Sequence, residues 1–442
     1  MTPPHPPNGN RPLPGPPQNG WPPPGPQSPP SWQQQNWQQQ PPPSAQQPRR
    51  TSKAPLIISV AAGAVLVLLL GLGMFAFRGG GGTEAAGEER GGERFLQLTP
   101  GGPAARYGAT PAYDACATVP PAVLEQIGLK LALDRQLEHS YAKDDELPER
   151  AIEDSEMSGC DYLIDSTASP TDLVSLKVYQ QPRSSETELE LVAESPASQD
   201  VPVSTSTDRG FQVGYWQDPD QRGGWRATVA RPDVAVDVLI TLSDPEYGGR
   251  PVDQVVGELT TRIVDGLAAG PAALDISYTG RYADTPNPCD VLNGAALEAS
   301  FPVQASNWVR DYYLPGELRM AEADGYRVDT GCTRTAAVDG DIFGPDPDSI
   351  SADFMNWEDV EVGRKYVANK CDHPILGKPP VRTEVQIGDG TTCLTDLNGD
   401  WRLEFQSGRT TVTLGSSSAS QDPQEVARML EPAAREVIRN LG

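Results

Sequence analysis

The sequence predicts an α+β protein with two tandem modules, each an antiparallel sheet covered by helices, after a single transmembrane helix and a disordered tail. Three observations support this prediction. The composition changes near Arg78, an uncharged apolar run lies just before that change, and similar motifs recur in the same order twice after it. A chain of 442 residues has room for two or three domains.

Charge and proline are distributed unevenly. The chain has 35 Lys and Arg against 60 Asp and Glu, a net charge of -25. Of its 45 prolines, 19 lie between Met1 and Pro55, and no acidic residue precedes Glu84. Residues 1–78 carry +5, which leaves 30 basic and 60 acidic residues, or -30, for residues 79–442. Such an acidic chain is not expected to bind nucleic acid, since phosphate binding needs clustered Lys and Arg.

Residues 1–53 consist almost entirely of Pro, Gln, Gly, Asn and Ser. Proline removes backbone donors and favours extended backbone, and few aliphatic side chains are present to form a core. We therefore expect a disordered, proline-rich cytoplasmic tail of low complexity. Its tryptophans are candidate contacts for a partner that grips proline-rich peptides, namely Trp21, Trp32 and Trp37.

Residues 54–77 are uncharged and lie between Lys53 and Arg78. At about 1.5 Å per residue, a helix of this length crosses the roughly 30 Å hydrocarbon core of a bilayer. The segment 1–53 before it is too long for the start of a cleaved signal peptide, so we predict an uncleaved signal anchor. Basic residues in the nearest turns favour a cytoplasmic N-terminus. The protein is then a single-pass protein of the cell membrane with its C-terminal domains extracellular.

Residues 78–106 read as a flexible, charged linker, because they begin with RGGGGTEAAGEERGGER. The two modules follow at 107–270 and 281–442, and their equivalence rests on the internal repeat. In order along the chain, the equivalent residues are Cys116 and Cys289, Cys160 and Cys332, and Trp225 and Trp401.

Strand and helix patterns recur in the same order. The runs VAVDVLITL from Val234 and RTTVTLG from Arg409 alternate as half-buried strands do. Each module then closes with an amphipathic helix. Its apolar positions are Val252, Val256, Leu259, Ile263 and Leu267 in the first module, and Val426, Leu430, Ala433, Val437 and Leu441 in the second. Asp422 is the expected cap of the second helix, and Pro432 is expected to kink or split it.

All six cysteines follow the apolar run, and an even set in a large exported region suits disulfides. Six cysteines allow 15 connectivities, so the expected pairing rests on symmetry. Equivalent positions of the two modules pair in the same way, and the two cysteines that occur only in the second module pair with each other. The expected pairs are Cys116–Cys160, Cys289–Cys332 and Cys371–Cys393. The alternative is a metal site at Cys371 and His373, but no further Cys or His lies at zinc-finger spacing. We expect no metal and no cofactor.

Residues for catalysis are few. Of the three histidines, His5 lies in the tail, and His139 lies on the charged side of a helical stripe formed by Leu133, Leu137 and Tyr141. We therefore expect His139 to be a solvated surface residue. No nucleophile elbow, zinc-protease helix or phosphate-binding loop motif occurs in the sequence. The expectation is a protein that is not an enzyme and has no catalytic residue.

Two acidic loops are candidate cation sites. Asp396, Asn398 and Asp400 resemble the start of a calcium loop, but Trp401 stands where the turn glycine belongs, so a hairpin turn is the better interpretation. The second loop is expected to be solvated, and its acids are Asp339, Asp341, Asp346 and Asp348. With 60 acidic residues, some pair of carboxylates will lie close enough for glycoside cleavage.

The NPCD segment at 287–290 and the Gly331-Cys332 pair resemble the motifs of a family of exported actinobacterial domains of unknown function, often found as lipoproteins. The first module matches less closely, with DAC at 114–116 and Gly159-Cys160. The resemblance implies an envelope location and an antiparallel sheet covered by helices. It implies no activity and no catalytic residues, and here a transmembrane helix would replace the lipid anchor.

We therefore expect a non-enzymatic envelope protein whose duplicated, disulfide-bonded ectodomain binds an extracytoplasmic ligand or protein partner, across the groove between the copies. One alternative is a carboxylate-dependent envelope hydrolase, which requires an acid pair lining a cleft. The other is a scaffold that recruits cytoplasmic partners through its proline-rich tail.

Overall fold

The computed structural model describes residues 90–107, 110–142, 156–180, 203–218, 223–321, 323–337, 348–397, 399–417, 420 and 422–442. All of them belong to the compact unit Gly73–Gly442. The predicted tail at 1–53, the apolar run at 54–77 and the loop acids Asp339, Asp341 and Asp346 lie outside the described residues. Among the helices that the structure describes, none is long and apolar enough to cross a bilayer. The signal anchor and the tail therefore stay predictions.

The elements fall into three groups along the chain. The N-terminal strands are β1 (Arg90–Arg94), β2 (Leu96–Gly102), β3 (Arg106–Tyr107) and β4 (Thr110–Pro111). The first half (110–269) continues with α2 (Ala115–Thr118), α3 (Pro121–Gln126), β5 (Leu137–Ala142), β6 (Glu156–Leu163), β7 (Leu173–Gln180), β8 (Ser204–Asp208), β9 (Phe211–Gln217), β10 (Gly224–Arg231), β11 (Val234–Thr241), β12 (Glu246–Tyr247), β13 (Arg250–Pro251) and α5 (Val252–Ala269).

The second half (273–442) contains β14 (Ala273–Tyr278), η3 (Gly280–Tyr282), α6 (Pro288–Val291), α7 (Gly294–Ser300), β15 (Ala305–Tyr313), β16 (Gly316–Met320), β17 (Gly325–Ala336), β18 (Ser349–Trp357), α8 (Val360–Asp372), β19 (Val381–Arg382), β20 (Cys393–Leu397), β21 (Asp400–Ser407), β22 (Thr410–Ser416) and α9 (Pro423–Leu441). The strands predicted from Val234 and Arg409 are thus present as β11 and β22, and the closing helices as α5 and α9.

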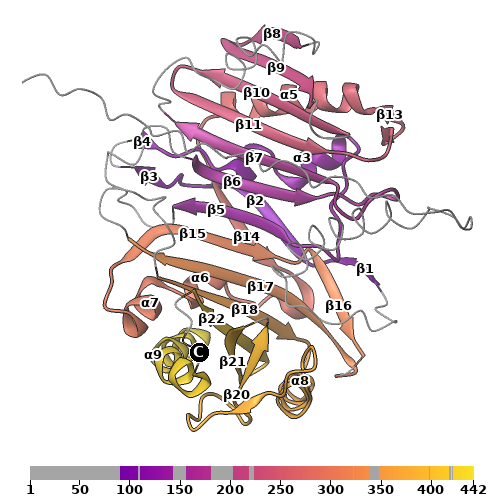
Figure 1. Ribbon diagram of the computed structural model, residues 1–442. Coiled ribbons are helices and arrows are strands. Elements are labelled where there is room, and N and C mark those ends of the chain that lie inside the picture. The colour runs from indigo at the N-terminus through magenta and orange to yellow at the C-terminus, as the bar shows by residue number, and fades with distance from the viewer. Residues whose placement is uncertain are drawn as a thin grey trace, which may run out of the picture. The chain divides into compact units, whose positions relative to one another are not determined.

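One antiparallel sheet of 16 strands runs through both halves, which confirms the α+β prediction (Figure 1). The prediction of a separate sheet in each module is wrong. The strand order is β19-β20-β21-β22-β18-β17-β15-β5-β6-β7-β11-β10-β9-β8, so β15 and β5 join the halves edge to edge. An exposed edge leaves backbone N–H and C=O groups unpaired, and pairing two edges satisfies both rows.

The two halves share one strand order outward from the β5–β15 pair. On one side β5, β6 and β7 are followed by β11, β10 and β9, and on the other β15, β17 and β18 are followed by β22, β21 and β20. In each half, the last strand of the later group, β11 or β22, pairs with the last strand of the earlier group, β7 or β18. The halves therefore build the same pattern in opposite directions from the centre.

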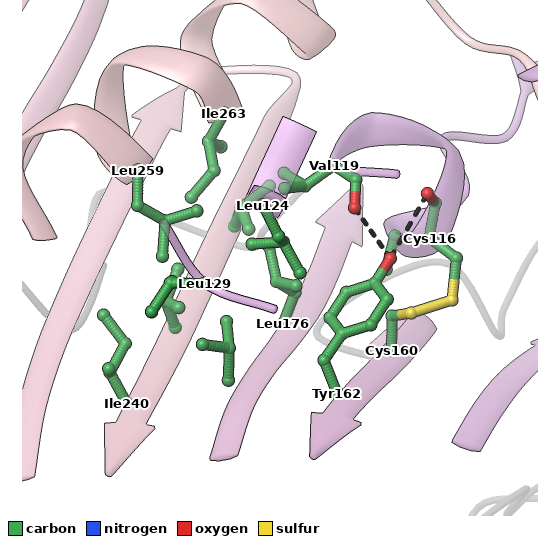
Figure 2. Packing of buried hydrophobic residues seen from close by; sticks show 14 of the residues in the cluster. Cys116, Val119, Leu124, Leu129, Cys160, Tyr162, Leu176, Ile240, Leu259 and Ile263 are labelled. Carbon is green, nitrogen blue, oxygen red and sulfur yellow. Dashed lines mark hydrogen bonds between the residues drawn. A yellow bond between two sulfur atoms is a disulfide. The ribbon is translucent and has the colours of Figure 1, made fainter. Parts of the chain in front are cut away.

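In the first half, α2, α3 and α5 pack on one face of the sheet and close an apolar core (Figure 2). Leu259 and Ile263 of α5 face Leu176 and Ile240 of the strands in this core. The hydroxyl of Tyr162 donates to Val119 O at 2.7 Å and lies 3.4 Å from Cys116 O. Strand β6 is therefore tied to α2 and to the residue that follows this helix.

In the second half, α6, α7 and α9 pack on the sheet in the same way, and α8 covers the opposite face. Phe405 of β21 lies in the core with Leu430 and Val437 of α9. The next residue, Gln406, points the other way and donates through Nε2 to Val360 O at the start of α8. This half of the sheet is therefore a central layer with helices on both faces.

Helix α9 begins as predicted, with the Asp422 side chain accepting from the backbone N–H of Gln424. It runs without interruption to Leu441, so the prediction that Pro432 splits it is wrong. Pro432 is exposed, and its two neighbours toward the core, Leu430 and Ala433, are fully buried. Water can hydrate the carbonyl that loses its donor, while the buried face keeps the helix in place.

The predicted linker at 78–106 is also wrong in its described part. Strand β1 pairs with β16, and β2 pairs with β14. Phe95 and Leu96 are buried, and their backbone N–H groups donate to Pro315 O at 2.9 and 3.1 Å. The apolar side chains that follow the glycine-rich stretch bring this segment into the folded unit.

All six cysteines form disulfides in the pairs that symmetry favoured, with Cα–Cα distances of 5.2, 5.2 and 5.7 Å for Cys116–Cys160, Cys289–Cys332 and Cys371–Cys393. The first two pairs each join the helix that opens a half to its second sheet strand, namely α2 to β6 and α6 to β17. The third joins α8 to β20. The alternative of a metal site at Cys371 and His373 is wrong, because the Cys371 sulfur is bonded to Cys393, and His373 Nδ1 lies 3.0 Å from Asn369 O.

Candidate functional site

The junction of the halves is the β5–β15 pair, in which His139 lies opposite Asp311 and Ser140 opposite Arg310. Side chains alternate between the two faces of a sheet. His139 and Asp311 point to the face that carries α2 and α6, whereas Ser140 and Arg310 point to the opposite face. The junction therefore has two sites with different surroundings.

On the helix-covered face, His139 is only 3% exposed and forms the centre of an ionic cluster. Its Nε2 lies 2.9 Å from Asp114 Oδ2, and its Nδ1 lies 3.5 Å from Asp311 Oδ1. Asp114 also caps α2 by accepting from Ala117 N. The prediction of a solvated helical His139 is wrong, because Leu137, His139 and Tyr141 alternate along β5 and share the buried face.

Burial disfavours the charged imidazolium of His139, but the nearby carboxylates of Asp114 and Asp311 outweigh it and raise the pKa of His139 to about 10. The ring is therefore a cation at neutral pH. It stacks on Tyr141 with ring centroids 4.2 Å apart. The Tyr313 hydroxyl donates to Asp311 Oδ2 at 2.9 Å, so Asp311 is held from both halves.

The same cluster contains the group of possible metal ligands found among the described residues, Asp114, Cys116 and His139. The Cys116 sulfur is bonded to Cys160, so it has no thiolate to offer a metal. His139 is held as a cation by two carboxylates, whereas a metal ligand must be a neutral imidazole. These residues do not fit a metal ion, and the cluster joins the halves.

On the opposite face, a polar cavity of about 220 Å³ lies beside the junction. Gly159 is among the residues that line it, and the charged or polar side chains on this face around it are Glu138, Ser140, Glu156, Asp161, Lys177 and Arg310. One row of neighbours across four strands is Arg310, Ser140, Gly159 and Lys177. The adjacent row contains Glu138 beside Asp161.

Neighbouring side chains lie directly over Gly159 and over its equivalent Gly331, so neither position has room for a Cβ. A Cβ on Gly159 would lie 2.5 Å from Glu156 Oε1 and 2.6 Å from Ser140 Oγ. In the second half, a Cβ on Gly331 would lie 2.1 Å from the ring of Tyr312. In both Gly-Cys pairs, the cysteine thus faces a helix and the glycine lies on the opposite face, under a side chain of the neighbouring strand.

The two halves differ in the side chain that lies opposite the glycine. Tyr312 pairs with Gly331, its ring fills the space above, and its hydroxyl donates to Asp353 Oδ1 at 2.9 Å. Ser140 pairs with Gly159, and in the place of a ring its hydroxyl and the Glu156 carboxylate lie over the glycine. Both groups also line the cavity, so the first half has smaller polar groups where the second half holds a phenol ring.

Charges of both signs face the cavity. Lys177 Nζ lies 2.9 Å from Glu156 Oε2, and the Ser140 hydroxyl is 3.4 Å from Glu156 Oε1. Burial raises the pKa of Asp161 above its ordinary value, and a hydrogen bond with Ser175 opposes this shift. Arg310 is exposed at the rim and belongs to the second half, whereas the other charged groups come from the first.

The remaining predicted candidates lie elsewhere. Asp396 and Asp400 belong to a β20–β21 hairpin, in which Asp396 Oδ1 accepts from Gly399 N at 2.6 Å, so the hairpin prediction is confirmed. Sequence analysis missed every charged residue of the cavity. The available signal was the Gly-Cys repeat together with Ser140, which occupies in the first half the position that Tyr312 occupies in the second.

Comparison of the chain with protein-family models, curated proteins and solved structures finds no match. The resemblance to exported actinobacterial domains therefore stays a prediction. Only the residues of the site itself bear on its function.

Proposed function

We propose that the chain is a single-pass envelope protein with two duplicated, disulfide-bonded modules, anchored by residues 54–77, and that the modules form one extracytoplasmic binding unit. The shared strand order and the two equivalent disulfides support duplication. Buried disulfides persist in oxidising compartments, which supports a position outside the membrane. The net charge of -30 after residue 78 suits a soluble extracytoplasmic unit.

The cavity above Gly159 is the proposed binding site, and the observation that supports it is the exchange of Tyr312 for Ser140 between equivalent positions. Ligand sites typically enclose about 300–1,000 Å³, so a cavity of about 220 Å³ suits a small molecule. The function proposed is therefore the binding of a small polar ligand, without chemical conversion.

Mass spectrometry of the full chain, purified in mild detergent, tests this proposal. The variant Ser140→Tyr places in the first half the ring that fills the second, and Tyr312→Phe is the matched control because it leaves the cavity unchanged. We expect wild type and Tyr312→Phe to release a small molecule on denaturation that Ser140→Tyr lacks. Equal small-molecule content in all three proteins contradicts the proposed site.

A second candidate function is carboxylate-dependent hydrolysis, and the carboxyl groups of the cavity favour it. Glu138, Glu156 and Asp161 face one space, burial raises the pKa of Asp161, and Lys177 forms an ion pair with Glu156. A carboxylic acid with a raised pKa beside an ionised carboxylate is the arrangement used for glycoside cleavage. Turnover of an envelope glycan fragment that Asp161→Asn abolishes would favour this candidate over pure binding.

The scaffold alternative is separable by deletion of residues 1–48. If the tail recruits the partner that defines the function, deletion abolishes function while the disulfide-bonded unit stays folded. The binding proposal instead expects the same released small molecule from the truncated protein as from the full chain.

A further inference from the structure

The arrangement of charges in the cavity selects among small polar ligands. Strands in a sheet lie roughly 4.8 Å apart and alternate residues along a strand lie roughly 6.7 Å apart. Arg310 and Ser140 are neighbours in one row, and Glu138 and Asp161 are neighbours in the next row. The cavity thus presents a cationic group and two carboxyl groups within the length of one small molecule.

Part of this charge is already compensated within the protein. Lys177 holds Glu156 at 2.9 Å, and the Ser140 hydroxyl lies on the other Glu156 oxygen. The Arg310 guanidinium lies at the rim, and the Glu138 and Asp161 carboxyl groups also line the cavity. Arg310 and Lys177 both attract Asp161, but burial outweighs them and raises the pKa of that carboxyl group.

A ligand with a single charge is poorly matched to such a cavity. Since Lys177 and Glu156 pair with each other, a simple anion on Arg310 would lie beside the carboxyl groups of Glu138 and Asp161, and a simple ammonium ion on those carboxyl groups would lie beside Arg310. A molecule that carries both charges can place each against its opposite. Charge-assisted hydrogen bonds of this kind are about twice as strong as neutral ones.

We infer that the ligand of the cavity is a small zwitterion of the α-amino acid class, with its carboxylate on Arg310 and Ser140 and its ammonium on Glu138 and Asp161. This inference rests on the proposed function, because it names the ligand class of the same cavity. The size of the cavity, about 220 Å³, favours a short side chain.

Calorimetric titration of the full chain in detergent, freed of bound small molecules by dialysis, tests the class. The probes are L-alanine, ethylamine and propionate, three molecules of nearly equal size that carry both charges, the ammonium alone and the carboxylate alone. We expect L-alanine to bind at least about tenfold more tightly than either of the other two.

Two variants test which residue binds the carboxylate of the ligand and which binds its ammonium group. Arg310→Gln is expected to bring the affinity for L-alanine down to that for ethylamine, and Asp161→Asn to bring it down to that for propionate. Glu361→Gln, which removes an exposed acid on α8, is the control and should leave all three titrations unchanged. Ser140→Tyr should abolish binding of L-alanine altogether.

The possible failures separate the two proposals. If ethylamine binds as tightly as L-alanine and Arg310→Gln has no effect, the zwitterion class is overturned while a ligand site remains. If no probe binds, yet Ser140→Tyr still loses the small molecule that the purified wild type releases, the class is again overturned and the proposed function stands. If no probe binds and Ser140→Tyr releases the same molecules as wild type, both proposals are overturned.

Discussion

The two halves of the sheet place different side chains over the same glycine. In the second half the ring of Tyr312 crosses Gly331 and hydrogen-bonds to Asp353, which Arg402 also contacts at 3.2 Å. In the first half the Ser140 hydroxyl and the Glu156 carboxylate lie over Gly159, beside a cavity that charged residues line. Since the strand order and the helix-to-strand disulfides are common to both halves, they serve the fold, and what differs between the halves is the candidate for function.

The largest expected effect concerns what the halves share. Replacing both cysteines of Cys116–Cys160, or both of Cys289–Cys332, should each lower the free energy of unfolding by about 4 kcal/mol, because each bond closes a loop of about 44 residues. Urea unfolding of the two double-alanine variants measures this. If only one of the two double variants lost stability, the two disulfides would not be structurally equivalent.

The next effect concerns the ionic cluster that joins the halves. His139→Leu leaves the fully buried Asp311 without its cation, which should cost about 3 kcal/mol, the lower part of the range for a broken buried ion pair. The lower value is expected because Asp114 is 14% exposed and is partly hydrated. His373→Leu, at an exposed histidine, is the control and should change the unfolding free energy by less than about 0.5 kcal/mol.

Exchanging the distinguishing side chains should have a smaller and unequal effect. Tyr312→Ser removes a ring packed over Gly331 and should destabilise by about 2 kcal/mol, whereas Ser140→Tyr has to displace only the Glu156 carboxylate beside the cavity and should cost about 1 kcal/mol. Thermal unfolding of both variants compares them. Equal destabilisation by the two changes would show that the first half has no space for the ring.

The last expected effect is a pH dependence carried by His139. Because its pKa rises from 6.5 to about 10 on folding, its contribution to stability is fully present below pH 6.5 and is lost as the pH rises toward about 10. The free energy of unfolding should fall by no more than about 1.4 kcal/mol for each pH unit in this window. In His139→Leu this fall should be absent, and its persistence there would assign it to another group.

Local signals were sufficient for much of the fold. The cysteine spacing predicted the three disulfides, and the alternation from Val234 and Arg409 predicted strands that the structure contains. The capping residue Asp422 predicted the start of α9. These signals succeed because each depends on residues close together in the sequence or on a repeat that compares like with like.

The junction could not be predicted in the same way. Leu133, Leu137 and Tyr141 fit a helical spacing, while Leu137, His139 and Tyr141 fit a strand equally well, and the partner that buries His139 is Asp311, in the other half of the chain. No local sequence pattern indicates that β5 of the first half pairs with β15 of the second. The cavity was missed for the same reason, since Arg310 comes from one half and Asp161 from the other.

Hydrogen–deuterium exchange of the full chain, with and without L-alanine, tests most directly whether the first half alone carries a binding site. The account predicts that L-alanine slows exchange of backbone amides in β5, β6 and β7 and leaves the equivalent amides of β17 and β18 unchanged. Equal slowing on both sides of the junction, or slowing only around Gly331, would contradict it.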